Sequence, residues 1–90
     1  MLEWKITCAG KVAKQLRKVP KREQELFGTL LRDLRSQGPV LPEWPNYSKL
    51  RDNHYHCHLS YRWVACWKVI DKTVKVIDVY YVGSRENAPY

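Results

Sequence analysis

The chain reads His54-Tyr55-His56-Cys57-His58-Leu59 near its middle, and this stretch holds all three of its histidines. Successive side chains of an extended strand point to opposite faces, so the three histidines would share one face of a strand. The alternate positions carry Tyr55, Cys57 and Leu59, which are typical of a buried core. We therefore expect a strand over residues 54–59 whose histidines look outward from the sheet.

Segments with strand-like patterns surround this stretch. Residues Tyr47–Arg51 are predicted as a short edge strand, and Trp63–Ile70 as a longer strand. The segment Thr73–Val82 is nearly all apolar in its second half, which is typical of a central strand covered on both faces. Tight turns near Ser60–Arg62 and at Asp71-Lys72 join these segments, and strands joined in this way pair antiparallel.

The N-terminal part of the chain predicts one strand and two helices. Residues Leu2–Cys8 alternate apolar and polar side chains, as a half-buried strand does. Apolar residues then recur at helical spacing from about Gly10 to Pro20, and again until Gly38-Pro39 stops the second helix. Residues 83–90 at the other end are expected to form a polar tail.

The resulting order, β-α-α-β-β-β with the edge strand as an optional addition, predicts an α+β fold. Two N-terminal helices would pack on one face of a small, mainly antiparallel sheet, and residues 1–90 would form a single domain. The histidines can then occupy only the sheet face that the helices leave free.

Composition narrows the class of protein. Hydrophobic residues make up 44% of the chain, with four Trp and six Tyr, so a real core is available. The three cysteines form no CxxC pair and are odd in number, which argues against a disulfide framework and for a reducing cytoplasm. We expect Cys57 and Cys66 to be packing residues. No signal peptide is recognisable and no run approaches the roughly 20 apolar residues of a membrane span, so we expect no membrane partner.

The charge of the chain indicates a polyanionic partner. The formal net charge is +7 at pH 7, and the pI is about 9.5. Such a balance most often serves binding to nucleic acid, although solubility or an acidic protein partner would also account for it.

Three short segments in the second half of the chain resemble a known protein family. The ending Val82-Gly83-Ser84-Arg85-Glu86, preceded by Tyr55-His56-Cys57-His58-Leu59 and Val69-Ile70-Asp71, is similar to RelE-like members of the RelE/ParE superfamily of bacterial toxins. The resemblance is strongest over residues 49–86 and rests on pattern alone over residues 1–37. It implies the toxin of a type II toxin-antitoxin system. Such a toxin is a ribosome-dependent endoribonuclease, or mRNA interferase, which cuts mRNA in the ribosomal A site, represses translation and is neutralised by a cognate antitoxin protein.

The resemblance also implies site residues, position by position. His56 and His58 stand where RelE carries two lysines, and Arg85 matches the arginine of the Val-Gly-x-Arg-Glu ending. Arg62 lies close to a further active-site arginine, although the turn is one residue shorter here and Val64 is the gap-free alternative. The catalytic set implied in this way is His56, His58, Arg62 and Arg85.

Two further groups are expected around the catalytic set. Tyr90 stands near, but one residue away from, a C-terminal tyrosine that stacks on a base in the family. The residues expected to bind substrate or its bases are His54, Tyr90, Lys49 and Arg51. The basic residues expected to contact ribosomal RNA are Lys11, Lys14, Arg17, Lys18, Lys21 and Arg22.

Two histidines and two arginines are sufficient chemistry for cutting RNA without a metal or cofactor. The reaction needs a base for the 2′-hydroxyl, an acid for the leaving 5′-oxygen, and positive charge around the phosphorane. Imidazole, with an unperturbed pKa near 6.5, serves as base or acid at neutral pH, and arginine binds phosphate oxygens bidentately. Alternate residues of a strand lie about 6–7 Å apart, which suits a pair that flanks one phosphate.

Other interpretations of the same residues stay open. The histidines could form a merely solvated face, or the His-x-His spacing could bind Zn²⁺. Arg85 could pair with an acid, Tyr90 could be frayed, and Trp63 and Trp67 are better explained as core than as base platforms. The chain could also be a ParE-like gyrase-inhibiting toxin or a non-catalytic RNA-binding module.

Overall fold

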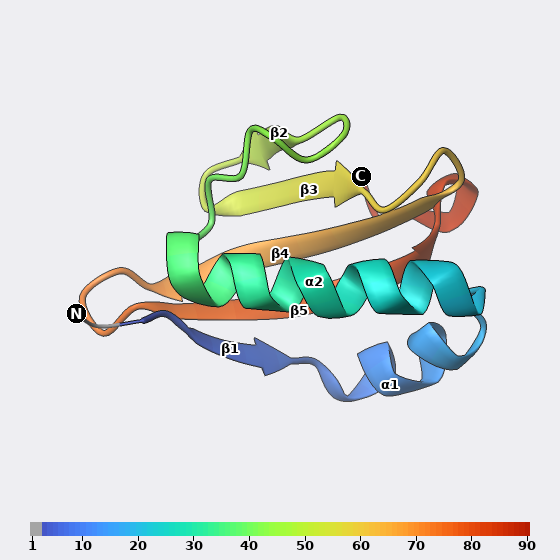
Figure 1. Cartoon of the computed structure of the whole chain (residues 1–90). Coiled ribbons are helices and arrows are strands. Elements are labelled where there is room, and N and C mark those ends of the chain that lie inside the picture. The colour runs from blue at the N-terminus through green and yellow to red at the C-terminus, as the bar shows by residue number, and fades with distance from the viewer. Residues whose placement is uncertain (1–2) are drawn as a thin grey trace.

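A five-stranded sheet with two helices over one face forms the protein (Figure 1). The structure is a computed structural model, which describes residues 3–90. Its elements are β1 (Lys5–Cys8), α1 (Gly10–Arg17), α2 (Lys21–Gln37), β2 (Ser48–Arg51), β3 (His54–His58), β4 (Trp63–Asp71), β5 (Val76–Ser84) and the short 3₁₀ helix η1 (Arg85–Asn87). The predicted α+β class is confirmed, and four strands follow the helices because the optional edge strand is present. Leu2, which the predicted first strand included, lies outside the described residues.

The strand order is β1-β5-β4-β3-β2. The first strand pairs parallel with β5, and every other neighbouring pair is antiparallel. The apolar strand β5 therefore lies between two others, as its composition predicted, and β2 lies at the edge. The histidine strand β3 is held between β2 and β4, so its backbone is fixed on both sides.

The two helices cover one face of the sheet. In Figure 1, α2 lies in front of the sheet and runs roughly along β4 and β5, and α1 lies beside one end of β5. Phe27, Leu30 and Leu34 of α2 are buried against the sheet, as the helical spacing of apolar residues predicted. Within residues 3–90, neither helix has both the length and the hydropathy of a transmembrane span.

Buried residues form two clusters, one on each face of the sheet. The main core lies under the helices and takes Tyr55 and Cys57 from β3 and the fully buried Trp67 from β4. A smaller cluster on the opposite face contains Val64, Cys66 and Tyr81. The face without helices is therefore partly covered rather than bare.

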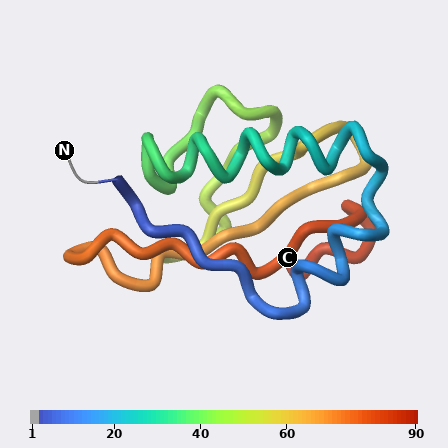
Figure 2. The backbone as a smooth tube through the Cα atoms, turned by 60° about the horizontal axis from the view of Figure 1, so that its bottom comes forward, coloured from blue at the N-terminus to red at the C-terminus, as the bar shows by residue number. Residues whose placement is uncertain are grey.

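The C-terminal residues provide part of that cover. The prediction of a polar tail over residues 83–90 was wrong for Gly83 and Ser84, whereas residues 85–87 and 89–90 are exposed. Gly83 and Ser84 continue β5, and η1 follows directly. The tube in Figure 2 reverses direction after β5, and Ala88 packs against the smaller cluster. The packing of Ala88 and the hydrogen bond from the Arg85 backbone N–H to the Arg62 carbonyl hold the segment against the sheet. The local pattern of apolar and polar residues does not predict these contacts.

Candidate active site

The histidines lie on the face of β3 opposite the helices, as their spacing predicted. His56 pairs with Cys66 and His58 pairs with Val64 across the antiparallel β3–β4 ladder. Both partners belong to the smaller cluster on the free face. The strand is further fixed by the His58 backbone N–H, which donates to the Pro45 carbonyl at 2.8 Å.

His56 and His58 are nevertheless buried, which corrects the expectation that they look outward into solvent. Only 7% of His56 and 6% of His58 is exposed. The ring of Tyr90 lies 4.5 Å from the ring of His56, centroid to centroid. On the other side, the Ser48 hydroxyl of β2 lies 3.0 Å from Nδ1 of His56. Tyr90 and the edge strand β2 therefore shield His56. The low exposure of both histidines excludes a merely solvated face.

The two imidazoles face each other across a short gap. Their ring centroids are 5.8 Å apart and the ring planes are inclined by 63°. Burial is the largest cause that lowers the pKa of His56, and the neighbouring His58 lowers it further, while a hydrogen bond with the backbone of Ser48 opposes both. The neutral form of His56 is therefore favoured, and neutral imidazole is the form that accepts a proton.

The pKa of His58 is lowered as well. Burial is again the first cause, the charge of Arg85 is the second, and hydrogen bonds with the backbone of Ser60 and Tyr61 act in the opposite direction. Because an arginine guanidinium keeps its proton at every physiological pH, Arg85 supplies permanent positive charge beside His58.

Arg85 is held in place by the turn between β3 and β4. Its backbone N–H donates to the Arg62 carbonyl at 2.7 Å. Its guanidinium carbon lies 4.7 Å from the ring centroid of Tyr61. A cation over an aromatic face is stabilised electrostatically, so Tyr61 orients a side chain that is otherwise exposed. Among residues 3–90, Arg85 forms no ion pair with an acid.

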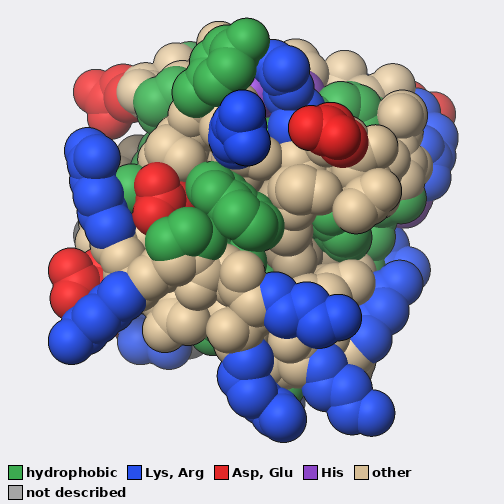
Figure 3. All heavy atoms as spheres, turned by 90° about the vertical axis from the view of Figure 1, so that its right-hand side faces the viewer, with side chains coloured by type: hydrophobic (Ala, Val, Ile, Leu, Met, Phe, Trp, Pro, Cys, Tyr) green, Lys and Arg blue, Asp and Glu red, His purple; other side chains and the backbone are tan. Residues whose placement is uncertain are grey.

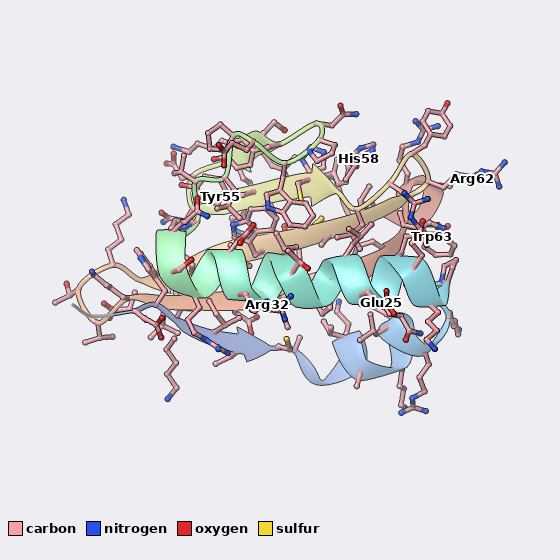
Figure 4. The ribbon with its side chains drawn as sticks, in the orientation of Figure 1. Glu25, Arg32, Tyr55, His58, Arg62 and Trp63 are labelled. Atoms are coloured by element: carbon pink, nitrogen blue, oxygen red, sulfur yellow. The ribbon has the colours of Figure 1, made fainter. Side chains whose placement is uncertain are left out.

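Arg62 is close to Arg85 in backbone. In Figure 4 the Arg62 side chain extends beyond the end of the sheet, away from His58. Both arginines line a depression of about 350 Å³, whose lining residues are Tyr61, Arg62, Trp63, Ser84, Arg85 and Glu86. The gap-free alternative, Val64, is fully buried in the smaller cluster. The structure thus brings Arg85 to the histidine pair and leaves Arg62 at its margin.

Of the expected substrate-binding residues, His54 and Tyr90 lie on the histidine face and Lys49 does not. Lys49 pairs with Tyr55, whose side chain belongs to the main core, so its side chain leaves β2 on the helix side. Its ammonium group lies 3.8 Å from a carboxylate oxygen of Asp52. The period of two along β2 could have given this result, because Ser48 and Lys49 must point to opposite faces. Arg51 pairs with His54 after an irregularity in the β2–β3 register.

The basic residues expected to contact ribosomal RNA lie along α1 and at the start of α2. All six are exposed: Lys11, Lys14, Arg17, Lys18, Lys21 and Arg22. Figure 3 shows Lys and Arg side chains gathered at the bottom of that face, where α1 lies in Figure 1. This basic surface, meaning these six residues, is separate from the histidine pair near the top of the molecule.

Several neighbours of the histidines were missed by reading the sequence. Ser48 contacts His56, and Tyr80 lies beside His54. Tyr61 contacts Arg85, the cation whose charge acts on His58. Tyr80 and Tyr81 should point to opposite faces of a regular strand, but both pack on the smaller cluster. The β4–β5 register shifts between Cys66 and Trp67, which leaves Tyr80 as the extra residue of a bulge. No feature of the local sequence announces that bulge.

Two of the three cysteines, Cys57 and Cys66, are packing residues, as expected, whereas Cys8 is exposed. Cys57 and Cys66 are fully buried on opposite faces of the sheet. Burial raises the pKa of both thiols, that of Cys66 to about 12. Within the described residues no group of three or more His, Cys, Asp or Glu side chains is arranged to hold a metal ion.

Three solved structures share this fold over nearly the whole chain. The archaeal RelE–RelB complex from Pyrococcus horikoshii OT3 gives a TM-score of 0.74 at 17% identity, covering 94% of this chain and 98% of that chain. The E. coli DinJ–YafQ toxin-antitoxin complex gives 0.75 at 17% identity, covering 97% and 98%. A metal-bound toxin from Helicobacter pylori gives 0.70 at 18% identity, covering 96% and 97%.

These likenesses establish the fold. The resemblance to RelE-like proteins is confirmed at that level, from β1 to η1. No protein-family model matches the sequence, and neither does any curated protein.

Proposed function

We propose that this chain is the toxin of a type II toxin-antitoxin system and acts as a ribosome-dependent endoribonuclease on mRNA. The observation that carries the proposal is the pair His56 and His58, with lowered pKa values, beside Arg85 on the free face of a RelE-type sheet. The same fold is that of solved toxins named RelE and YafQ. The site is small, so orientation of the substrate by ribosomal RNA is part of the proposal.

The proposed reaction is attack of a ribose 2′-oxygen on the adjacent phosphorus. One neutral imidazole of the pair takes the 2′-hydroxyl proton, and the P–O5′ bond breaks as the 2′-oxygen bonds to phosphorus. The other imidazole, protonated once the phosphate offsets the charge of Arg85, gives its proton to the leaving 5′-oxygen. The products are a 2′,3′-cyclic phosphate and a 5′-hydroxyl. Arg85 stabilises the charge on the phosphorane oxygens.

Tyr90 has a position consistent with binding a base. About half of its surface is exposed while its ring touches His56. An incoming nucleotide can stack on the open side of this ring, and stacking of one base on an aromatic side chain contributes roughly 1–3 kcal/mol.

The test is cleavage of a defined mRNA on purified translating ribosomes, with the same RNA free in solution as the comparison. We expect cuts at the A-site codon, little cleavage of the free RNA, and no effect of a chelator. His58→Ala should reduce the single-turnover rate by about 10²–10⁴-fold and leave ribosome binding unchanged, whereas Arg85→Ala should weaken both. Lys72→Ala, an exposed lysine in the β4–β5 turn, is the control.

Two outcomes would contradict the proposal. Equal cleavage of free RNA would remove the ribosome dependence, and full toxicity of a His56→Ala, His58→Ala double variant would remove the histidines from the chemistry. Damage to supercoiled DNA by gyrase in place of mRNA cleavage would favour the ParE-like alternative.

The pH dependence gives an independent check on the histidine pair. Since one histidine must be neutral and the other protonated, kcat/KM should follow a bell whose limbs belong to the coupled pair. Both pKa values are lowered from 6.5 in the free protein, so the maximum should lie on the acid side of that value. A rate that stays flat between about pH 5 and 8 would contradict titration of the pair.

We also propose an antitoxin protein as the partner of this chain. Two of the solved neighbours are complexes of a toxin with RelB or DinJ. The charge of +7 and the partly exposed segment from Arg85 to Tyr90 suit an acidic or amphipathic helix that covers or displaces this segment. Cross-linking of the complex should place antitoxin residues on it, and a complex that leaves both the segment and the sheet face uncovered would contradict this mode of inhibition.

A further inference from the structure

A second cluster of polar and aromatic side chains lies further along the histidine face, beyond the catalytic pair. Nδ1 of His54 lies 3.3 Å from the Tyr80 hydroxyl, and the two rings meet edge to face with centroids 5.6 Å apart. The ammonium group of Lys68 lies 5.7 Å from the centroid of the Tyr80 ring. These residues come from three adjacent strands, β3, β4 and β5.

Two cations flank this cluster. Lys68 is the ladder partner of His54 on β4, and Arg51 is its partner on β2. Burial is the largest cause that lowers the pKa of His54, and the charges of Arg51 and Lys68 lower it further. Neither cation forms an ion pair among residues 3–90. Asp78 lies opposite Lys68 in the β4–β5 ladder, and one of its carboxylate oxygens accepts a hydrogen bond from the Thr7 hydroxyl at 2.6 Å. Asp52, which follows Arg51, lies 3.8 Å from the Lys49 ammonium group.

We propose that Arg51, His54, Lys68 and Tyr80 form a second nucleotide subsite for single-stranded RNA. The phosphate would lie between Arg51 and Lys68, and the base would lie against the Tyr80 and His54 rings. Cationic side chains interleaved with aromatic rings are the general solution for binding a single strand, because the charges follow the backbone and the rings stack on bases.

The position of the subsite suits a neighbouring nucleotide of the same strand. His54 and His56 are two residues apart on β3, or about 7 Å along the strand, and both point to the free face. RNA held at His56 and His58 can therefore continue across the sheet to His54 without leaving the surface. The inference deepens the proposed function and rests on it, since it assigns this surface to the same RNA substrate.

The test measures binding of short fluorescent single-stranded RNAs that carry 2′-O-methyl groups and cannot be cut. Dissociation constants are taken by fluorescence anisotropy over a series of salt concentrations, with a mononucleotide as the shortest probe and a hexanucleotide as the longest. The variants are Lys68→Ala, Tyr80→Phe and Tyr80→Ala, with Lys72→Ala as the control that removes the same charge elsewhere. Thermal unfolding of each variant checks the fold.

For the hexanucleotide, Lys68→Ala should weaken binding and reduce the slope of log K against log salt by about 0.7, the value for one phosphate of a single strand that is no longer neutralised. Tyr80→Ala should weaken binding about tenfold, which corresponds to one base that no longer stacks, while Tyr80→Phe keeps the ring and most of the affinity. The mononucleotide should bind wild type and Lys68→Ala with the same affinity, because it occupies the catalytic pair alone.

The subsite would be overturned if Lys68→Ala and Lys72→Ala bound the hexanucleotide with the same affinity and the same slope of log K against log salt. Absence of measurable binding by both variants would overturn it as well. The ribosome assay separates this failure from failure of the proposed function. If wild type cuts mRNA on ribosomes and Lys68→Ala binds the hexanucleotide as tightly as wild type, the subsite alone is refuted. If Lys68→Ala weakens RNA binding but wild type cuts no mRNA on ribosomes, the proposed nuclease activity is refuted and the subsite stands.

Discussion

Buried neutral histidines couple the stability of this protein to pH. The pKa of His56 and that of His58 are both lowered in the folded chain, with burial as the first cause. The unfolded chain keeps values near 6.5. As the pH falls through 6.5, the unfolded chain takes up protons that the folded chain does not, so the folded state loses stability. Above that pH both states are neutral at these positions and the full stability is present.

We therefore expect the free energy of unfolding to fall as the pH is lowered from about 7.5 to 5. Urea denaturation at several pH values measures it. The double variant His56→Gln, His58→Gln should show a flatter dependence, because glutamine does not titrate. An identical slope in the variant and in wild type would contradict a contribution from this pair.

At the scale of elements, the segment that follows β5 sets the environment of the site. Tyr90 covers His56, and burial is the largest cause of the lowered pKa of His56. Tyr90→Ala should therefore let water reach the imidazole and raise its pKa towards 6.5. An NMR titration of the His56 ring protons measures this shift.

The control for this prediction is Tyr90→Phe, which keeps the ring and should leave the pKa of His56 unchanged. Tyr90→Ala should also weaken RNA binding, since it removes the stacking surface. If the pKa of His56 stays the same in Tyr90→Ala, the cover must come from β2 rather than from the C-terminal segment.

Two glycines in different elements should respond oppositely to alanine. A Cβ at Gly83 in β5 would lie 2.7 Å from the Tyr81 hydroxyl oxygen, whereas a Cβ at Gly28 in α2 would meet nothing within 4 Å. Overpacking in a filled site destabilises by about 1–3 kcal/mol. Replacing glycine in an open helix interior stabilises by about 0.5–1 kcal/mol.

Thermal and urea unfolding of Gly83→Ala and Gly28→Ala should thus give shifts of opposite sign. Gly83→Ala should also reduce RNA cleavage more than its stability loss explains, because Gly83 lies two residues before Arg85. A stabilised Gly83→Ala variant would mean that the Tyr81 ring moves aside at little cost.

At the scale of the whole molecule, the charge is distributed over two separate surfaces. The basic surface on α1 and the start of α2 is exposed and distant from the histidine pair in Figures 1 and 3. Its role as a contact for ribosomal RNA is a prediction. Replacing Lys11, Lys14 and Lys18 by alanine should weaken ribosome binding and reduce its salt dependence, by up to about one unit of slope for each phosphate that the variant no longer neutralises.

The matched control replaces three exposed cations elsewhere, Arg32, Lys72 and Arg35, which keeps the change in net charge equal. Binding to ribosomes is measured by co-sedimentation at increasing salt. If both triple variants bind ribosomes with the same reduced affinity, the net charge of the molecule matters and the basic surface has no specific role.

How much of this could be predicted differs between the fold and the site. The alternation in residues 54–59, the apolar spacing in α2 and the breaker Gly38-Pro39 are local signals, and each gave its element to within a few residues. They also placed the histidines on the face away from the helices. Arg85 was implied by the resemblance. Its charge lowers the pKa of His58, and its place in the site and its catalytic role stay predictions.

The sequence by itself determined the α+β class, the order of elements and the face of β3 that carries the histidines, because periodicity within one element fixes which side chains share a side. Only the tertiary structure decided that Tyr90 and Ser48 bury His56, that a bulge turns Tyr80 towards His54, and that Arg62 points away from the site. Each of these depends on residues far apart in the chain that are brought together by packing. Burial and charge at the site are sums over such neighbours, and no local pattern contains them.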